Sequence, residues 1–170
     1  MPGQYIVKQG NVLEPELLYN EENIEEQIII PHVVNNLGVM GAGVALALKN
    51  KWPEVEEEYL ALKDIRGLDL GEICWANVGK RTIVVNMIAQ DGLRSNENTR
   101  PLKYSALIDC MRHVYYRISY LLGVSNTKRV IHAPKFGSEL AGGKWEFIEE
   151  LIKEIWIDNN VDVVIYELKR

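Results

Sequence analysis

The chain contains 170 residues, of which 47% are hydrophobic, and it carries a formal net charge of −5. This length fits one domain, which can bury about two-thirds of the surface that the unfolded chain exposes. The Lys and Arg residues are scattered along the sequence, so it lacks the basic stripe that binds an extended nucleic acid. We therefore expect a single domain over residues 1–170 and no extended DNA or RNA partner.

The cysteines and the first residues give further expectations. Cys74 and Cys110 lie far apart in apolar segments, and no Cys/His or acidic cluster has the spacing of a metal site. We expect no metal and no cofactor. The start lacks a basic stretch followed by an apolar core, and no apolar run reaches the length of a membrane span. These patterns favour a cytoplasmic protein without a membrane partner.

Short runs rich in β-branched residues alternate with segments of helical periodicity along the chain. Pro31 lies inside the second run and predicts that this strand bends or ends early. The alternation indicates an α/β fold with a largely parallel or mixed sheet and helices on both faces. The expected strands are 5–7, 28–34, 72–78, 82–88, 129–133 and 161–167, and the expected helices are 44–50, one beginning at Pro53, 102–122, and one from Trp145 to Ile155.

The loop after the second expected strand is a candidate site, because ligands bind outside the carboxyl ends of the strands in such sheets. Segment 32–45 passes from a strand through a polar turn into Gly41-Ala42-Gly43 and a helix. Glycine lets a backbone approach a ligand, and free N–H groups at a helix start favour an anion. The segment can equally be a tight turn, and it matches neither the P-loop nor the dinucleotide fingerprint.

A second segment, 133–145, again runs from a strand through a glycine-containing loop into a helix. By itself it can be a flexible connection. On neighbouring parallel strands, however, two such loops would form opposite lips of one cleft that can hold a diphosphate. The two segments together therefore favour a binding site over two unrelated turns.

The order and spacing of these segments resemble the macro domain family, and in particular its ADP-ribose 1″-phosphate phosphatase branch. The resemblance runs over the whole chain, from residues 5–15 through the two glycine loops and Trp52-Pro53 to residues 164–168. It implies a three-layer α/β/α domain with a central mixed sheet. It also implies a pocket for ADP-ribose or ADP-ribose 1″-phosphate, free or carried by ADP-ribosylated macromolecules.

The resemblance further implies the residues that contact the ligand. Asn35 would contact the distal ribose, and the ring of Tyr166 would lie against the adenine. From the residues alone, Tyr166 can equally be a core residue and Asn35 a turn-former. The remaining adenine-end residues would be Gly10, Asn11, Val12 and Leu168, and the phosphates would be held by Gly41, Ala42, Gly43, Val44, Ala45, Gly137, Ser138, Glu139, Leu140, Ala141 and Gly142.

Three positions depart from related proteins in the family. Those that remove ADP-ribose from carboxylate side chains use a lysine and an aspartate where this sequence has Gln90 and Ala141. Neither side chain can act as an amine nucleophile or as a carboxylate acid or base, so covalent lysine chemistry is not expected. Glu139 is the third departure, since small residues are usual at that point.

The candidate catalytic residues are Asn35, His32 and Glu139. A histidine can protonate a leaving oxygen near neutral pH, as monoester hydrolysis needs. For His32 and His132 the alternative is an imidazole that is hydrogen-bonded beneath the loops. Three functions stay open: hydrolysis of ADP-ribose 1″-phosphate, ADP-ribose binding without turnover, and release of ADP-ribosyl groups by a route without the lysine.

Overall fold

Six strands form one sheet at the centre of the computed structural model, which describes residues 1–120 and 127–168. The strands lie side by side in the order β1-β6-β5-β2-β4-β3. Neighbouring strands are parallel, except that β3 at one edge runs antiparallel to β4. The strands are β1 Tyr5–Gln9, β2 Glu25–Asn35, β3 Ile73–Asn77, β4 Thr82–Gln90, β5 Thr127–Pro134 and β6 Asp162–Glu167.

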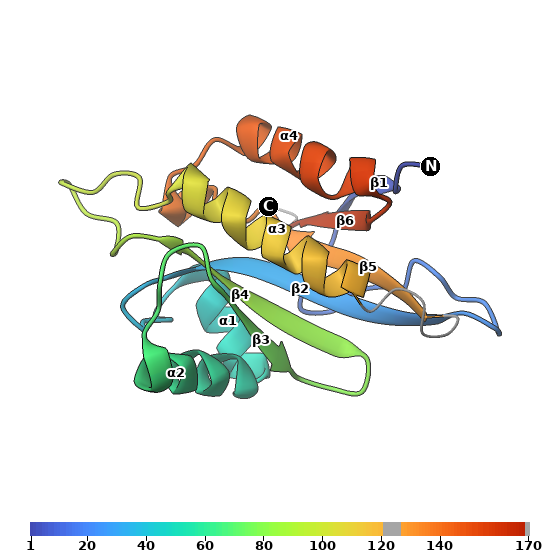
Figure 1. Cartoon of the computed structure of the whole chain (residues 1–170), viewed down its shortest axis with the longest axis horizontal. Coiled ribbons are helices and arrows are strands. Elements are labelled where there is room, and N and C mark those ends of the chain that lie inside the picture. The colour runs from blue at the N-terminus through green and yellow to red at the C-terminus, as the bar shows by residue number, and fades with distance from the viewer. Residues whose placement is uncertain (121–126, 169–170) are drawn as a thin grey trace.

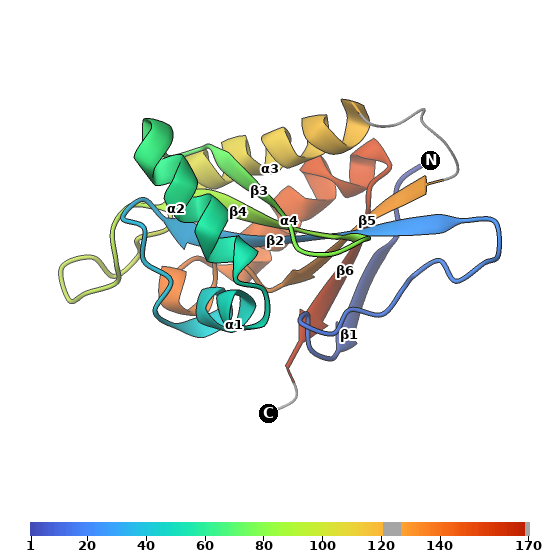
Figure 2. The same ribbon diagram turned by 90° about the horizontal axis from the view of Figure 1, so that it is seen from below.

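Helices cover both faces of the sheet (Figures 1 and 2). α1 and α2 pack on one face, where Leu48, Val55 and Tyr59 join its buried side chains, and α3 and α4 pack on the other. The predicted three-layer α/β/α fold with a mixed sheet is therefore confirmed. The helices are α1 Gly43–Lys51, α2 Glu54–Arg66, α3 Tyr104–Tyr120 and α4 Trp145–Ile155, with 3-10 turns η1 Glu139–Ala141 and η2 Ile157–Asn159.

Each predicted strand and helix is present, with ends that differ by a few residues. β4 reaches Gln90 instead of ending at Ile88, and α3 begins at Tyr104. The part of the expected helix from Leu121 onward lies outside the described residues. Within residues 1–120 and 127–168, no helix combines the length and apolar character that crossing a membrane requires.

The prediction that Pro31 ends its strand early is wrong. β2 runs through Pro31, and its ladder with β4 continues to Asn35. Its ladder with β5, however, stops at Ile29. Proline has no N–H to donate, and Pro31 lies where β2 is paired on one side alone. β2 and β5 therefore share a ladder in their first halves and none at their carboxyl ends.

The same pair of strands marks the point where the chain reverses its direction across the sheet. From β2 the chain builds β3 and β4 on one side, and it then crosses over to place β5 and β6 on the other. In open α/β sheets, ligands bind outside the carboxyl ends of the strands at this switch point. Topology and strand pairing thus direct attention to the gap between the ends of β2 and β5.

A buried hydrogen-bond relay joins β2, β5 and β6. Glu26 Oε2 lies 2.8 Å from His132 Nε2, and His132 Nδ1 lies 2.8 Å from the hydroxyl of Tyr166. Glu26 Oε1 accepts hydrogen bonds from the backbone amides of residues 18–19 at 2.7 and 2.8 Å, and the Tyr166 hydroxyl accepts one from the amide of Glu16 at 3.0 Å. The relay therefore fastens the segment between β1 and β2 to the sheet.

We expect Glu26→Ala to lower the free energy of unfolding by about 3 kcal/mol, because it leaves His132 and two amides without their buried acceptor. Glu25→Ala is the matched control, since Glu25 is the exposed neighbour on the same strand, and its effect should stay within about 0.5 kcal/mol. Urea unfolding of both variants measures the difference. Equal stabilities would contradict a structural role of the relay.

Candidate functional site

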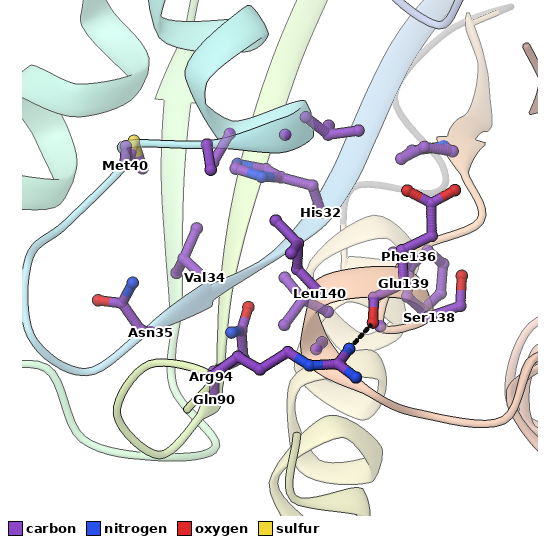
Figure 3. A pocket seen from close by; sticks show the side chains of 18 of the residues that line it. His32, Val34, Asn35, Met40, Gln90, Arg94, Phe136, Ser138, Glu139 and Leu140 are labelled. Carbon is purple, nitrogen blue, oxygen red and sulfur yellow. Dashed lines mark hydrogen bonds between the residues drawn. The ribbon is translucent and has the colours of Figure 1, made fainter. Parts of the chain in front are cut away.

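A cavity of about 380 Å³ opens where β2 and β5 separate (Figure 3). The first glycine loop and the start of α1 form one wall, the second glycine loop forms another, and the loop after β4 contributes to a third. This volume lies in the range of small-molecule sites. The lining residues are 32–35, 39–45, 90, 93–94 and 134–141.

The start of α1 offers hydrogen-bond donors to this cavity. Ala42 precedes the helix in an extended conformation, its side chain forms no cap, and the first turn contains no acidic residue. The first N–H groups of a helix have no partner within it, and the helix dipole gives this end a partial positive charge. The amides of residues 43–45 on the cavity wall can therefore receive an anionic group.

The two loops differ in whether the fold itself requires their glycine. A Cβ on Gly41 would have Val39 Cγ1 at 3.8 Å as its nearest neighbour, which is an ordinary contact. Gly142 has a φ of 80°, and a Cβ there would lie 2.6 Å from the carbonyl oxygen of Thr99. The fold itself requires glycine at 142, whereas no protein atom excludes a Cβ at 41, where the open space would let a ligand approach the backbone.

His32 lines the cavity but is only 2% exposed. Its Nε2 lies 2.5 Å from Asn86 Oδ1, while the amide nitrogen of Asn86 donates to the carbonyl of Val55 at 3.0 Å. Nε2 therefore carries the proton in this network. Burial lowers the pKa of His32 from 6.5 to about 4, so the ring is neutral near pH 7. This favours an acceptor role over the predicted one as proton donor.

The other imidazole nitrogen of His32 is an open acceptor. Nδ1 is buried and has no hydrogen-bond partner among the residues that the structure describes. A buried polar atom without a partner is uncommon in folded proteins. Nδ1 belongs to a lining residue but is itself buried, so a hydroxyl or N–H of a ligand can reach it only after a shift of the side chains around it.

Asn35 is occupied by the loop that follows it. Its Oδ1 accepts from the amides of Leu37 and Val39 at 3.0 and 3.2 Å and from the hydroxyl of Tyr59 at 2.9 Å. Its Nδ2 donates to the carbonyl of Val39 at 2.8 Å. The turn-forming role left open above is therefore present, and a ligand can use at most the second amide hydrogen of Asn35.

Glu139 and Arg94 join two walls of the cavity at its mouth. Glu139 is exposed and has a φ of 55°, in the left-handed region that few residues adopt. Its carbonyl oxygen accepts a hydrogen bond from Arg94 Nη1 at 2.8 Å, drawn as a dashed line in Figure 3. Arg94 was not predicted. The carboxyl-end rule also covers the loop after β4, which is parallel to β2, and that rule could have identified it.

Some of the predicted site residues lie together and others do not. The cavity contains Asn35, His32, all three departures (Gln90, Glu139 and Ala141), and the predicted residues of the two loops up to 141. The predicted adenine-end residues and Gly142 are not among the lining residues. The adenine contacts of the former and the phosphate contact of Gly142 stay predictions. The lining residues that sequence reasoning missed are Val33, Val34, Val39, Met40, Leu93, Arg94, Pro134, Lys135 and Phe136.

Tyr166 differs from the expectation that its ring lies against adenine. It is only 4% exposed, and its ring packs beside Gly10, where an added Cβ would lie 3.3 Å from Cδ1. Stacking on a base needs an accessible ring face. The structure instead places Tyr166 in the core, with its hydroxyl in the relay to His132. His132 is likewise fully buried and structural.

No protein-family model and no curated protein matches the chain, but solved structures do. A Bacteroides thetaiotaomicron protein of unknown function is 30% identical with a TM-score of 0.80, over 96% of this chain and 98% of that chain. A macrodomain protein from Streptomyces coelicolor is 26% identical with a TM-score of 0.75, over 96% of this chain and 99% of that chain. The chain therefore has the macrodomain fold.

A more distant structure shows the same fold with a ligand. It is Thermosipho africanus DarTG in complex with ADP-ribose, which is 18% identical and has a TM-score of 0.65. The match covers 83% of this chain and 38% of that one. At this identity the likeness concerns the fold of the macrodomain alone.

The buried neutral His32 should make the stability of this macrodomain depend on pH. Its folded-state pKa of about 4 lies below the ordinary value of 6.5, so the unfolded chain binds the proton more readily. The free energy of unfolding should fall as the pH drops from 6.5 towards 4, by about 1.4 kcal/mol per pH unit from this group. His32→Gln should reduce that slope in urea unfolding, whereas His113→Gln, at an exposed position, should not. Identical slopes in both variants would refute this assignment.

Proposed function

We propose that this macrodomain binds ADP-ribose in the cavity between β2 and β5 and hydrolyses the phosphate monoester of ADP-ribose 1″-phosphate. The observation that carries the binding proposal is the placement of an uncapped helix start opposite a second glycine loop at the switch point of the sheet. The structural relative solved with ADP-ribose supports the choice of ligand.

The proposed pose follows from the positions of the donors. The diphosphate would lie between the two glycine loops, where the amides of residues 43–45 can donate to its oxygens. The distal ribose would then lie towards Asn35 and Gln90, and one of its hydroxyls could donate to Nδ1 of His32. The adenine would extend towards the carboxyl ends of β1 and β6, outside the cavity walls.

The proposed reaction transfers the phosphoryl group to water. A water oxygen forms a bond to phosphorus, the bond from phosphorus to the 1″ oxygen breaks, and that oxygen takes up a proton to give ADP-ribose and inorganic phosphate. Amide donors would stabilise the charge on the phosphoryl oxygens. Of the three predicted catalytic side chains, only Glu139 is exposed, and its carboxylate is the one that could accept a proton from the water.

Gly41→Val tests the binding proposal. The Cβ of the new side chain has only an ordinary contact, with Val39 Cγ1 at 3.8 Å, so the fold should persist while ADP-ribose affinity falls about tenfold or more. Gly79→Val is the matched control, because Gly79 is exposed, lies outside the cavity and has no neighbour within 4 Å of an added Cβ. Titration calorimetry with ADP-ribose gives the affinities, and thermal unfolding checks the fold. Full affinity in folded Gly41→Val would place the ligand elsewhere.

A comparison of substrates tests the chemistry. Wild-type protein should release phosphate from ADP-ribose 1″-phosphate and little ADP-ribose from glutamate-linked substrates, because Gln90 and Ala141 provide neither amine nor carboxylate. Gly41→Val purified in parallel reports any contaminating phosphatase. ADP-ribose binding without phosphate release would reduce the function to binding. Efficient release from glutamate-linked substrates would instead establish a route that needs no lysine.

A further inference from the structure

We propose that Arg94 makes the cavity selective for ADP-ribose derivatives that carry an anionic group on the distal ribose, such as a phosphate monoester, over ADP-ribose itself. The inference rests on the proposed function, because that function supplies the ligand and its direction in the cavity. It goes further in assigning the discrimination between two ligands to one side chain. The evidence for it comes from the hydrogen bonds of the loop that holds Arg94 and from the charges around the cavity.

The loop after β4 is an ordered platform. Nδ2 of Asn98 donates to the carbonyl oxygens of Asp91 and Leu93 at 2.9 and 3.0 Å. Oδ1 of Asn36, from the loop after β2, accepts from the amide of Gly92 at 2.9 Å, and its Nδ2 lies 3.1 Å from Asp91 Oδ1. These bonds fix the backbone on both sides of Leu93 and attach it to the first glycine loop. Arg94 therefore extends from a preorganised segment.

Arg94 has donors to spare at the end of the cavity where the distal ribose would lie. Figure 3 shows Arg94 extending from the side of Gln90 to the second glycine loop, where its guanidinium meets the carbonyl of Glu139. One N–H donates to the neutral carbonyl oxygen of Glu139 at 2.8 Å, and a guanidinium carries five N–H groups. No carboxylate among the described residues forms an ion pair with Arg94. Its charge is thus available to a ligand.

Lys135 is the other cation among the described lining residues, and it is already paired. Its Nζ lies 2.6 Å from Glu167 Oε1 at the end of β6, on the side of β5 that faces away from β2. That ion pair satisfies the lysine and holds it on the adenine side of the proposed pose. A terminal phosphate at the opposite end would therefore meet Arg94.

The chemistry of the two partners gives the direction of selectivity. A guanidinium binds phosphate through a planar, bidentate fork in which both partners are charged, whereas in its bond to the Glu139 carbonyl only the donor is charged. If Arg94 exchanges the Glu139 carbonyl for a phosphate monoester, the affinity for the ligand that carries this phosphate should therefore rise. Unmodified ADP-ribose has no anionic group on its distal ribose. Arg94 should then stay bonded to the Glu139 carbonyl and contribute little to the affinity.

The test measures the dissociation constants of ADP-ribose and ADP-ribose 1″-phosphate by calorimetry for wild type, Arg94→Gln, Arg94→Lys and Arg100→Gln, with phosphate release followed to correct for turnover. Arg100 is the control, because it lies on the same loop with its guanidinium 4.6 Å from the ring of Tyr104 and does not line the cavity. Arg94→Gln should weaken the 1″-phosphate about 10- to 100-fold and ADP-ribose less than about twofold. Arg94→Lys should lie between, and Arg100→Gln should match wild type.

Two results would overturn the proposal in different ways. An equal change for both ligands in Arg94→Gln, or no change for either, would show that Arg94 does not discriminate, while the proposed function stands. Failure of wild-type protein to bind ADP-ribose would overturn the proposed function and the role of Arg94 with it. The loss in Arg94→Gln should also shrink as salt rises, since an exposed ion pair is screened.

Discussion

The end of the ladder between β2 and β5 is the constraint on which the rest of the site depends. A proline in the middle of a sheet removes one ladder donor, and here the strand keeps its course because β4 continues to pair with it to Asn35. The side towards β5 is left without ladder bonds beyond Ile29. The carboxyl ends of two neighbouring strands can then separate, and the cavity, both glycine loops and the start of α1 are arranged around that gap.

Most polar side chains at the site are bound to the protein itself. Asn35 shapes its own loop, His32 is held by Asn86, and Arg94 donates to the backbone carbonyl of Glu139. Such bonds fix the walls before a ligand arrives, which reduces the ordering that binding requires. Recognition then depends mainly on backbone amides, one open imidazole nitrogen and one guanidinium. With Gln90 and Ala141 in the cavity, these two positions supply neither an amine nucleophile nor a carboxylate acid or base.

The sequence predicted those features that are encoded locally. Strand and helix positions follow from periodicity, and the glycine loops follow from residues that are adjacent in the chain. The error at Pro31 arose because the tolerance of a strand for proline depends on which neighbour pairs with it, and pairing is not local. Tyr166 and Arg94 show the same limit. Tyr166 lies in the core with its hydroxyl bonded to His132, 34 residues away. Arg94 binds the carbonyl of Glu139, which is 45 residues away.

The relay from Glu26 through His132 to Tyr166 has a consequence for how the molecule opens. The amides of Leu18 and Tyr19 lie in a segment without regular secondary structure, yet they donate to a buried carboxylate. For these amide hydrogens to exchange with solvent deuterium, their bonds to the Glu26 carboxylate must break. That opening would also expose the buried contact between Glu26 and His132. The exchange of these two amides should therefore be as slow as that of the neighbouring strands, although they lie in an irregular segment.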